Sequence, residues 1–129
     1  MAMRVLIVDD SPACRAQARH AVEVAQASIS RVPGDVEVAE ADGGVQALRE
    51  LASTPVDLLV VDLNMPMVNG LELLSFWGRR ATSGSRAVVV STDVSPVDRE
   101  RARAFGAVAF CDKPVSPEAL VAALASIPD

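Results

Sequence analysis

Short apolar runs alternate with longer amphipathic segments along this chain. Several of the runs are apolar at almost every position, which is typical of strands that helices cover on both faces. Five runs are expected to be β-strands: Arg4 to Val8, Val36 to Ala39, Leu58 to Val61, Ala87 to Val90 and Val108 to Cys111.

Helix signals fill the segments between these runs. Serine followed by proline supplies an N-cap and a first-turn residue at Ser11-Pro12, Ser95-Pro96 and Ser116-Pro117. Gly106 is typical of a helix end. The expected helices are Ser11 to about Ala27, Gly44 to Ala52, Gly70 to Arg80, Val97 to Phe105 and Ser116 to about Ser126, with a loop over roughly Ser28 to Asp35.

Strand and helix thus alternate five times with short connections. This order predicts right-handed crossovers and a parallel sheet with helices on both faces. No repeat, low-complexity tract or linker interrupts it. We therefore expect one doubly wound α/β domain over residues 1–129.

Composition narrows the class of protein. The chain has 129 residues, of which 50% are hydrophobic and 22% charged, as expected for a globular domain with a core. A net charge of −5 argues against a general nucleic-acid-binding surface. No apolar run reaches the length of a membrane span, and Asp9-Asp10 ends the first run too early for a signal peptide. A cytoplasmic protein is expected.

The chain has only two cysteines and one histidine. Cys14 and Cys111 have no metal-binding spacing, and we expect them to be reduced and buried. One histidine, His20, is too few for most zinc, iron or Ser-His hydrolase sites, and we expect it on the surface without a role. Trp77 is expected to pack in the interior.

Polar residues follow the strands at the ends where such sheets bind ligands. Asp9-Asp10 follows the first run, Asp62 the third, Ser91-Thr92 the fourth, and Lys113 lies just beyond the fifth. Each alone is compatible with a turn or cap role. Together they predict a site of three carboxylates, which repel one another and call for a cation.

The residue types indicate phosphoryl chemistry at this edge. Carboxylates without a histidine or thiolate cluster favour magnesium over zinc, and magnesium commonly meets phosphate oxygens. The chain contains neither glycine-rich nucleotide motif, so a kinase or NTPase is not expected. An aspartate could instead form an acyl phosphate, with Lys113 pairing with the new charge.

These residues resemble the receiver domains of two-component response regulators, especially stand-alone CheY-like proteins. The likeness covers essentially the whole chain. It rests on Val8-Asp9-Asp10-Ser11, on Asp62-Leu63-Asn64-Met65-Pro66 with Gly70 eight positions after Asp62, on the strand-end hydroxyl and on Lys113-Pro114. It implies the flavodoxin-like, CheY-like form of the doubly wound fold.

The resemblance also implies roles for individual residues. Asp62 would be phosphorylated by a histidine kinase or phosphotransfer protein with Mg²⁺ assistance. Asp10, Asp62 and the Asn64 backbone carbonyl would bind the metal directly, and Asp9 would bind it through water. Lys113 would contact the phosphoryl group, while Gly70 and the Met65-Pro66 turn would shape the loop.

The switch and rate-tuning positions follow from the family's spacing. Counting back from Lys113 selects Ser91 as the switch hydroxyl and Phe110, three positions before the lysine, as the aromatic residue. Thr92 stands where the family usually has a small residue. Thr92 and Asp93 would slow the entry of water or phosphodonor, unless Thr92 simply faces solvent, and Asn64 is a further rate-tuning candidate.

The expected function is therefore a phosphoryl-accepting switch of a two-component phosphorelay, in a chemotaxis-like or other pathway. It would have no enzymatic activity beyond self-phosphorylation and self-dephosphorylation. The expected output is a change in affinity for a protein partner at the fourth helix and fifth strand. On that surface, Arg99, Arg101 and Arg103 either form a solvent-exposed charged face or contribute to the partner contact.

Two alternative functions are considered. One is a pseudo-receiver that binds a partner without phosphorylation. The other is a magnesium-dependent phosphohydrolase, which Asn64 disfavours because such enzymes usually need an aspartate at this position.

Overall fold

One parallel β-sheet forms the centre of the molecule in the computed structural model, which describes residues 3–28, 36–65, 69–81, 85–91, 94–113 and 115–125. The strand order is β2-β1-β3-β4-β5, as in flavodoxin-like folds. The strands are β1 (Met3–Val8), β2 (Val36–Ala41), β3 (Leu58–Val61), β4 (Arg86–Val90) and β5 (Ala107–Cys111). The prediction of a doubly wound parallel sheet is confirmed.

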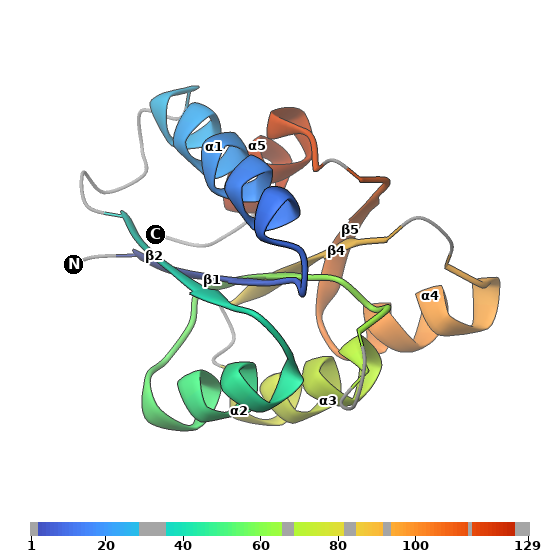
Figure 1. Cartoon of the computed structure of the whole chain (residues 1–129). Helices are drawn as coiled ribbons and strands as arrows, with labels where there is room; N and C mark the ends of the chain where they lie inside the picture. The colour runs from blue at the N-terminus through green and yellow to red at the C-terminus, as the bar shows by residue number, and fades with distance from the viewer. Residues whose placement is uncertain are drawn as a thin grey trace.

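Helices cover both faces of the sheet. α1 and α5 lie on one face, and α2, α3 and α4 lie on the other (Figure 1). Their bounds are α1 (Pro12–Ser28), α2 (Gly44–Ser53), α3 (Gly70–Arg80), α4 (Pro96–Ala104) and α5 (Pro117–Ala125). Within the described parts of the chain, none of these helices has both the length and the apolar character needed to cross a bilayer.

Side chains point alternately to the two faces of the sheet along each strand, and this divides the core into two halves. Val5 and Ile7 of β1 pack toward α1 and α5, whereas Leu6 and Val8 pack toward the other three helices. Successive side chains of a strand point to opposite faces, so a run that is apolar throughout fits a sheet covered on both sides. All four residues of β3 are buried for this reason.

The predicted boundaries differ from the observed ones by a few residues. β2 continues past Ala39 to Ala41, because its last residues still pair with the end of β1. The turn that follows α4 ends at Gly106, whose φ of +116° is readily adopted by glycine. Most of the predicted loop over Ser28 to Asp35 lies outside the described residues.

The expected burial of Trp77 and the expected surface position of His20 are confirmed, whereas the expected full burial of Cys14 and Cys111 is wrong. Trp77 is buried among α3 and its neighbours, and His20 is exposed on α1. Cys14 and Cys111 are free thiols but only half-buried. Cys14 borders the cavity at the strand ends, and Cys111 closes an edge strand, so neither lies in the closed part of the core.

Gly70 positions the end of β3 through a close backbone contact. A Cβ at this residue would lie 2.4 Å from Leu63 Cα and 2.5 Å from the Asp62 carbonyl oxygen. Backbone atoms cannot move aside as side chains do, so Gly70→Ala is expected to lower the free energy of unfolding by about 2–3 kcal/mol. Urea denaturation measures this change.

Gly43 offers a matched control for that substitution. Nothing lies within 4 Å of a Cβ built there, and its backbone is extended. Gly43→Ala should therefore cause no clash. Alanine is the poorer N-cap residue, but it loses less backbone entropy on folding, so stability should change by less than about 1 kcal/mol. Equal losses in the two variants would contradict the close packing of Gly70 against Leu63.

Candidate functional site

The predicted polar residues meet at the carboxyl ends of the central strands. The last residues of β1 and β3, Val8 and Val61, are direct neighbours in the sheet. Asp9 and Asp62 follow them and are therefore level with each other. Ser91 continues β4 in the same way, and its amide donates to the Cys111 carbonyl oxygen at 3.1 Å. Parallel strands thus bring distant segments to one edge.

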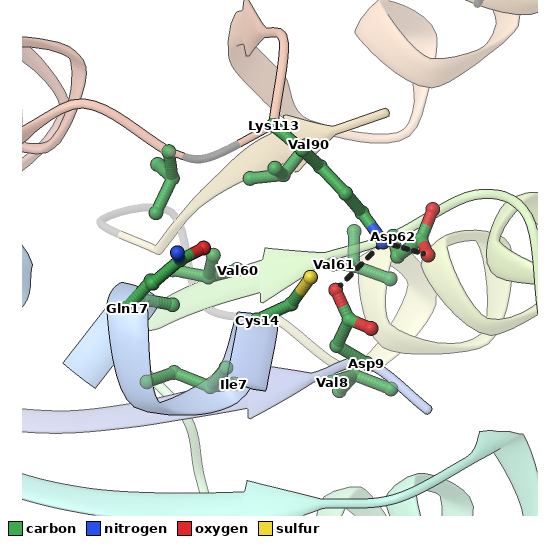
Figure 2. Close-up of a pocket in the computed structure, with 12 residues that line it drawn as sticks. Ile7, Val8, Asp9, Cys14, Gln17, Val60, Val61, Asp62, Val90 and Lys113 are labelled. Atoms are coloured by element: carbon green, nitrogen blue, oxygen red, sulfur yellow. Dashed lines mark hydrogen bonds and ion pairs between the residues drawn. The ribbon is translucent and has the colours of Figure 1, made fainter. Parts of the chain in front are cut away.

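Lys113 bridges two buried carboxylates at this edge. Its Nζ lies 2.8 Å from Asp62 Oδ2 and 3.0 Å from Asp9 Oδ2 (Figure 2). Asp9 is 5% exposed and Asp62 is 3% exposed, so the ammonium offsets two charges that are largely removed from water. Lys113 is the only lysine in the chain.

The carboxylates hold the lysine firmly in its charged form. Burial alone lowers the pKa of Lys113, but hydrogen bonds to Asp62 and Asp9 and the attraction of both charges raise it above its ordinary value. Lys113 therefore stays cationic across the neutral pH range.

Backbone amides fix the other oxygens of both carboxylates. Asp62 Oδ1 accepts from the Asn64 amide at 2.9 Å, and Asp9 Oδ1 accepts from the Ser11 amide at 2.9 Å. Each carboxylate is thus held between an amide and the ammonium, which restricts its rotation. The tight turn after each strand produces this arrangement, since the donor lies two residues after the acceptor.

Asp10 completes a cluster that could hold a metal ion. One carboxylate oxygen each from Asp9, Asp10 and Asp62 lies within 4.8 Å of the others, and Asp10 is exposed. Carboxylate oxygens are the donors that hard divalent cations prefer. The donor set at this edge therefore fits such an ion.

Asn64 links the acidic cluster to Ser91. Its side-chain Nδ2 donates to Ser91 Oγ at 2.7 Å, and Ser91 is 3% exposed. The structure therefore brings the predicted switch hydroxyl next to the cluster. Phe110 lies further away, beside α4. Thr92, Asp93, Pro66 and Pro114 lie outside the described residues.

Two site residues escaped the sequence-based prediction. Arg15 donates from Nη1 to the Asp9 carbonyl oxygen at 2.7 Å, and Cys14 lines the cavity with its sulfur directed toward Asp9 (Figure 2). Both belong to the first turns of α1. Their position in the sequence could have identified them, because a helix that begins directly after Asp9-Asp10 must place its first turns beside these two residues.

The hydrogen bond between Asn64 and Ser91 makes a testable contribution to stability. Asn64→Ala would leave a buried hydroxyl without this donor, and we expect the free energy of unfolding to fall by about 1 kcal/mol. In a double-mutant cycle with Ser91→Ala, the two losses should fail to add by a similar amount. Additive losses would show that the two side chains do not interact.

Comparisons with known proteins agree with this geometry. A family model described as the response regulator receiver domain matches residues 5–125. The chain belongs to this family. It is 34% identical over 120 residues to the nitrate/nitrite response regulator protein NarL of Escherichia coli strain K12, covering 93% of this chain and 52% of NarL.

Two further relatives differ in how much of their length they share with this receiver domain. It is 37% identical over 114 residues to protein-glutamate methylesterase/protein-glutamine glutaminase 3 of Rhodospirillum rubrum, covering 86% of the chain and 28% of that relative. The solved structure of chemotaxis protein CheY4 of Vibrio cholerae is 27% identical, with a TM-score of 0.77, over 99% of this chain and 100% of that one. The chain thus spans about half of NarL, less of the esterase and all of CheY4. The general function of the family is that of a phosphoryl-accepting switch in two-component response regulators.

Proposed function

We propose that Asp62 is the phosphoryl acceptor of this receiver domain. The observation that carries the proposal is the contact of Lys113 with Asp62 at 2.8 Å, beside Asp9 and Asp10. Asp62 follows β3 in the middle of the sheet, with its carboxylate held by one amide and one ammonium. A carboxylate oriented in this way can act as a nucleophile.

Transfer would proceed by attack of an Asp62 oxygen on phosphorus. With phosphohistidine as donor, the new oxygen–phosphorus bond forms as the phosphorus–nitrogen bond breaks. The histidine nitrogen leaves with the bonding electrons. The imidazole is then neutral if its other nitrogen already carries a proton; otherwise the leaving nitrogen takes a proton from solvent. Lys113, whose Nζ lies 2.8 Å from Asp62 Oδ2, would pair with an oxygen of the transferred group. The Ser91 hydroxyl would leave its contact with Asn64 and donate to another oxygen.

The metal at this site is proposed to be Mg²⁺. Asp10, Asp62 and the Asn64 backbone carbonyl would be direct ligands, and Asp9 would bind through water. When bound, Mg²⁺ would supply positive charge that offsets the negative charge on the phosphoryl oxygens. The all-oxygen cluster of three carboxylates supports this assignment.

Partners are proposed at the level of chemical class. The phosphodonor would be a histidine kinase or phosphotransfer protein, and the output would be altered affinity for a protein at α4 and β5, signalled through Phe110. Asn64, Thr92 and Asp93 would tune the rates of self-phosphorylation and self-dephosphorylation.

The extent of the domain and its cellular location are also proposals. We expect a single receiver domain over residues 1–129 and a cytoplasmic location, both on the basis of the sequence alone.

Incubation with acetyl phosphate and Mg²⁺, followed by intact-mass measurement, tests the proposal. The expected result is a gain of one phosphoryl group, with its yield strongly reduced by EDTA. An unmodified mass, together with an NMR spectrum that beryllofluoride leaves unchanged, would instead support the pseudo-receiver alternative. Repeated turnover of a small phosphomonoester would support the phosphohydrolase alternative.

A further inference from the structure

The Phe110 ring lies under two guanidinium groups of α4. Arg99 Cζ is 4.9 Å and Arg103 Cζ is 5.3 Å from the ring centroid, within the range of cation–π attraction. The two arginines are four residues apart and therefore lie on the same face of the helix. No carboxylate of the described residues forms an ion pair with either guanidinium, although the chain carries a net charge of −5.

A hollow lies beside this ring and reaches Ser91. It measures about 180 Å³ and is lined by Ser91 and Phe110, with Val94, Arg99, Cys111 and Asp112. An enclosed cavity of about 150 Å³ holds benzene, so this partly open hollow has about the volume that a phenyl ring needs. Ser91, on the far side, is hydrogen-bonded to Asn64, two residues after Asp62. Phe110 and Ser91 thus line the same hollow, and Asn64 connects Ser91 to the acidic cluster.

We propose that Arg99 and Arg103 are positioning residues that hold the Phe110 ring beside α4 and oppose its entry into the hollow. The inference rests on the proposed phosphorylation of Asp62. A phosphoryl group that draws the Ser91 hydroxyl away from Asn64 would enlarge the hollow on its inner side, and the ring could then move in. Because the arginines stabilise the outer position, they weaken the response to phosphorylation.

The size of the effect follows from population shift. Loss of both cation–π contacts should change the ratio of the two ring positions by about fivefold or more. A ligand that binds only the inner arrangement gains apparent affinity in proportion to the population of that arrangement. The variant Arg99→Gln/Arg103→Gln should therefore bind beryllofluoride about fivefold more tightly in the presence of Mg²⁺.

Fluorine NMR reports the ring position directly. The chain has three phenylalanines and no tyrosine, so labelling with fluorophenylalanine gives three signals, and Phe110→Leu identifies one of them. Without any phosphoryl mimic, the double variant should shift the Phe110 signal toward its position in the beryllofluoride complex. Arg101→Gln is the matched control, because Arg101 lies on the same helix and contacts no ring among the described residues. Arg99→Lys/Arg103→Lys should restore part of the wild-type shift.

The Phe110→Leu background separates a positioning role from a general effect of charge. There, the glutamine substitutions should leave the beryllofluoride affinity unchanged. The inference is overturned if the double variant keeps the wild-type Phe110 signal, or if the substitutions act equally with and without the ring. If wild-type protein responds to neither acetyl phosphate nor beryllofluoride, the proposed function fails. The inference about the arginines is then decided without any mimic: the double variant should move the Phe110 signal away from its wild-type position, and Arg101→Gln should not.

Discussion

Asp62→Asn is expected to lose the phosphoryl adduct completely under conditions in which wild-type protein is modified by acetyl phosphate and Mg²⁺. An amide is too weak a nucleophile to replace the carboxylate, although it has nearly the same shape. The fold should persist, because the oxygen of the substituted side chain could still accept from the Asn64 amide as Asp62 does at 2.9 Å. Intact-mass measurement gives the yield, and circular dichroism verifies folding.

Asp42 provides the matched control for this substitution. It follows β2 as Asp62 follows β3, so it lies at the same edge of the sheet, but it is exposed and outside the acidic cluster. Asp42→Asn should be modified as efficiently as wild type. Retention of the adduct in Asp62→Asn would show that another group accepts the phosphoryl, and loss in both variants would indicate a general effect of charge.

Lys113→Ala is expected to reduce both phosphorylation and stability. The substitution leaves the Asp9 and Asp62 carboxylates, 5% and 3% exposed, without their cation. Removing one partner of a buried ion pair costs about 3–5 kcal/mol. Because the Lys113 side chain is 22% exposed, we expect the free energy of unfolding to fall by about 2–3 kcal/mol when EDTA is present.

Mg²⁺ should reverse much of this loss, since a divalent cation at the cluster offsets the same two charges and binds only the folded chain. Urea denaturation with EDTA and with Mg²⁺ gives both values. Lys113→Arg keeps a cation and should retain more stability than Lys113→Ala. Equal stability of wild type and Lys113→Ala in EDTA would contradict the role of the ammonium in balancing the two carboxylates.

The fold was largely predictable because its signals are local. α3 has the predicted bounds, Gly70 to Arg80, since Asn69 caps it by accepting from the Glu72 amide. The turn at Gly106 was likewise predictable from residue type. The end of β2 was not, because Glu40 interrupts the apolar run, and pairing with β1 extends the strand to Ala41.

The members of the site were predictable, but several of their contacts were not. Position after a strand identifies Asp9, Asp62 and Ser91 as neighbours without any knowledge of side-chain direction. The hydrogen bond from Asn64 to Ser91 and the stacking of arginines on Phe110 depend on rotamers and on how α4 lies against β5. Sequence spacing contains neither kind of information. The partial exposure of Cys14 and Cys111 was missed for the same reason.

The central claim, that Asp62 is the phosphoryl acceptor, is tested most directly by locating the adduct. Wild-type protein is treated with acetyl phosphate and Mg²⁺, then with borohydride, which reduces an acyl phosphate and so leaves homoserine in place of the modified aspartate. Tandem mass spectrometry of the peptides then identifies the residue. Homoserine is expected at position 62 and at neither position 9 nor position 10. Conversion of a different carboxylate, or of none in a protein that is otherwise folded, would contradict it.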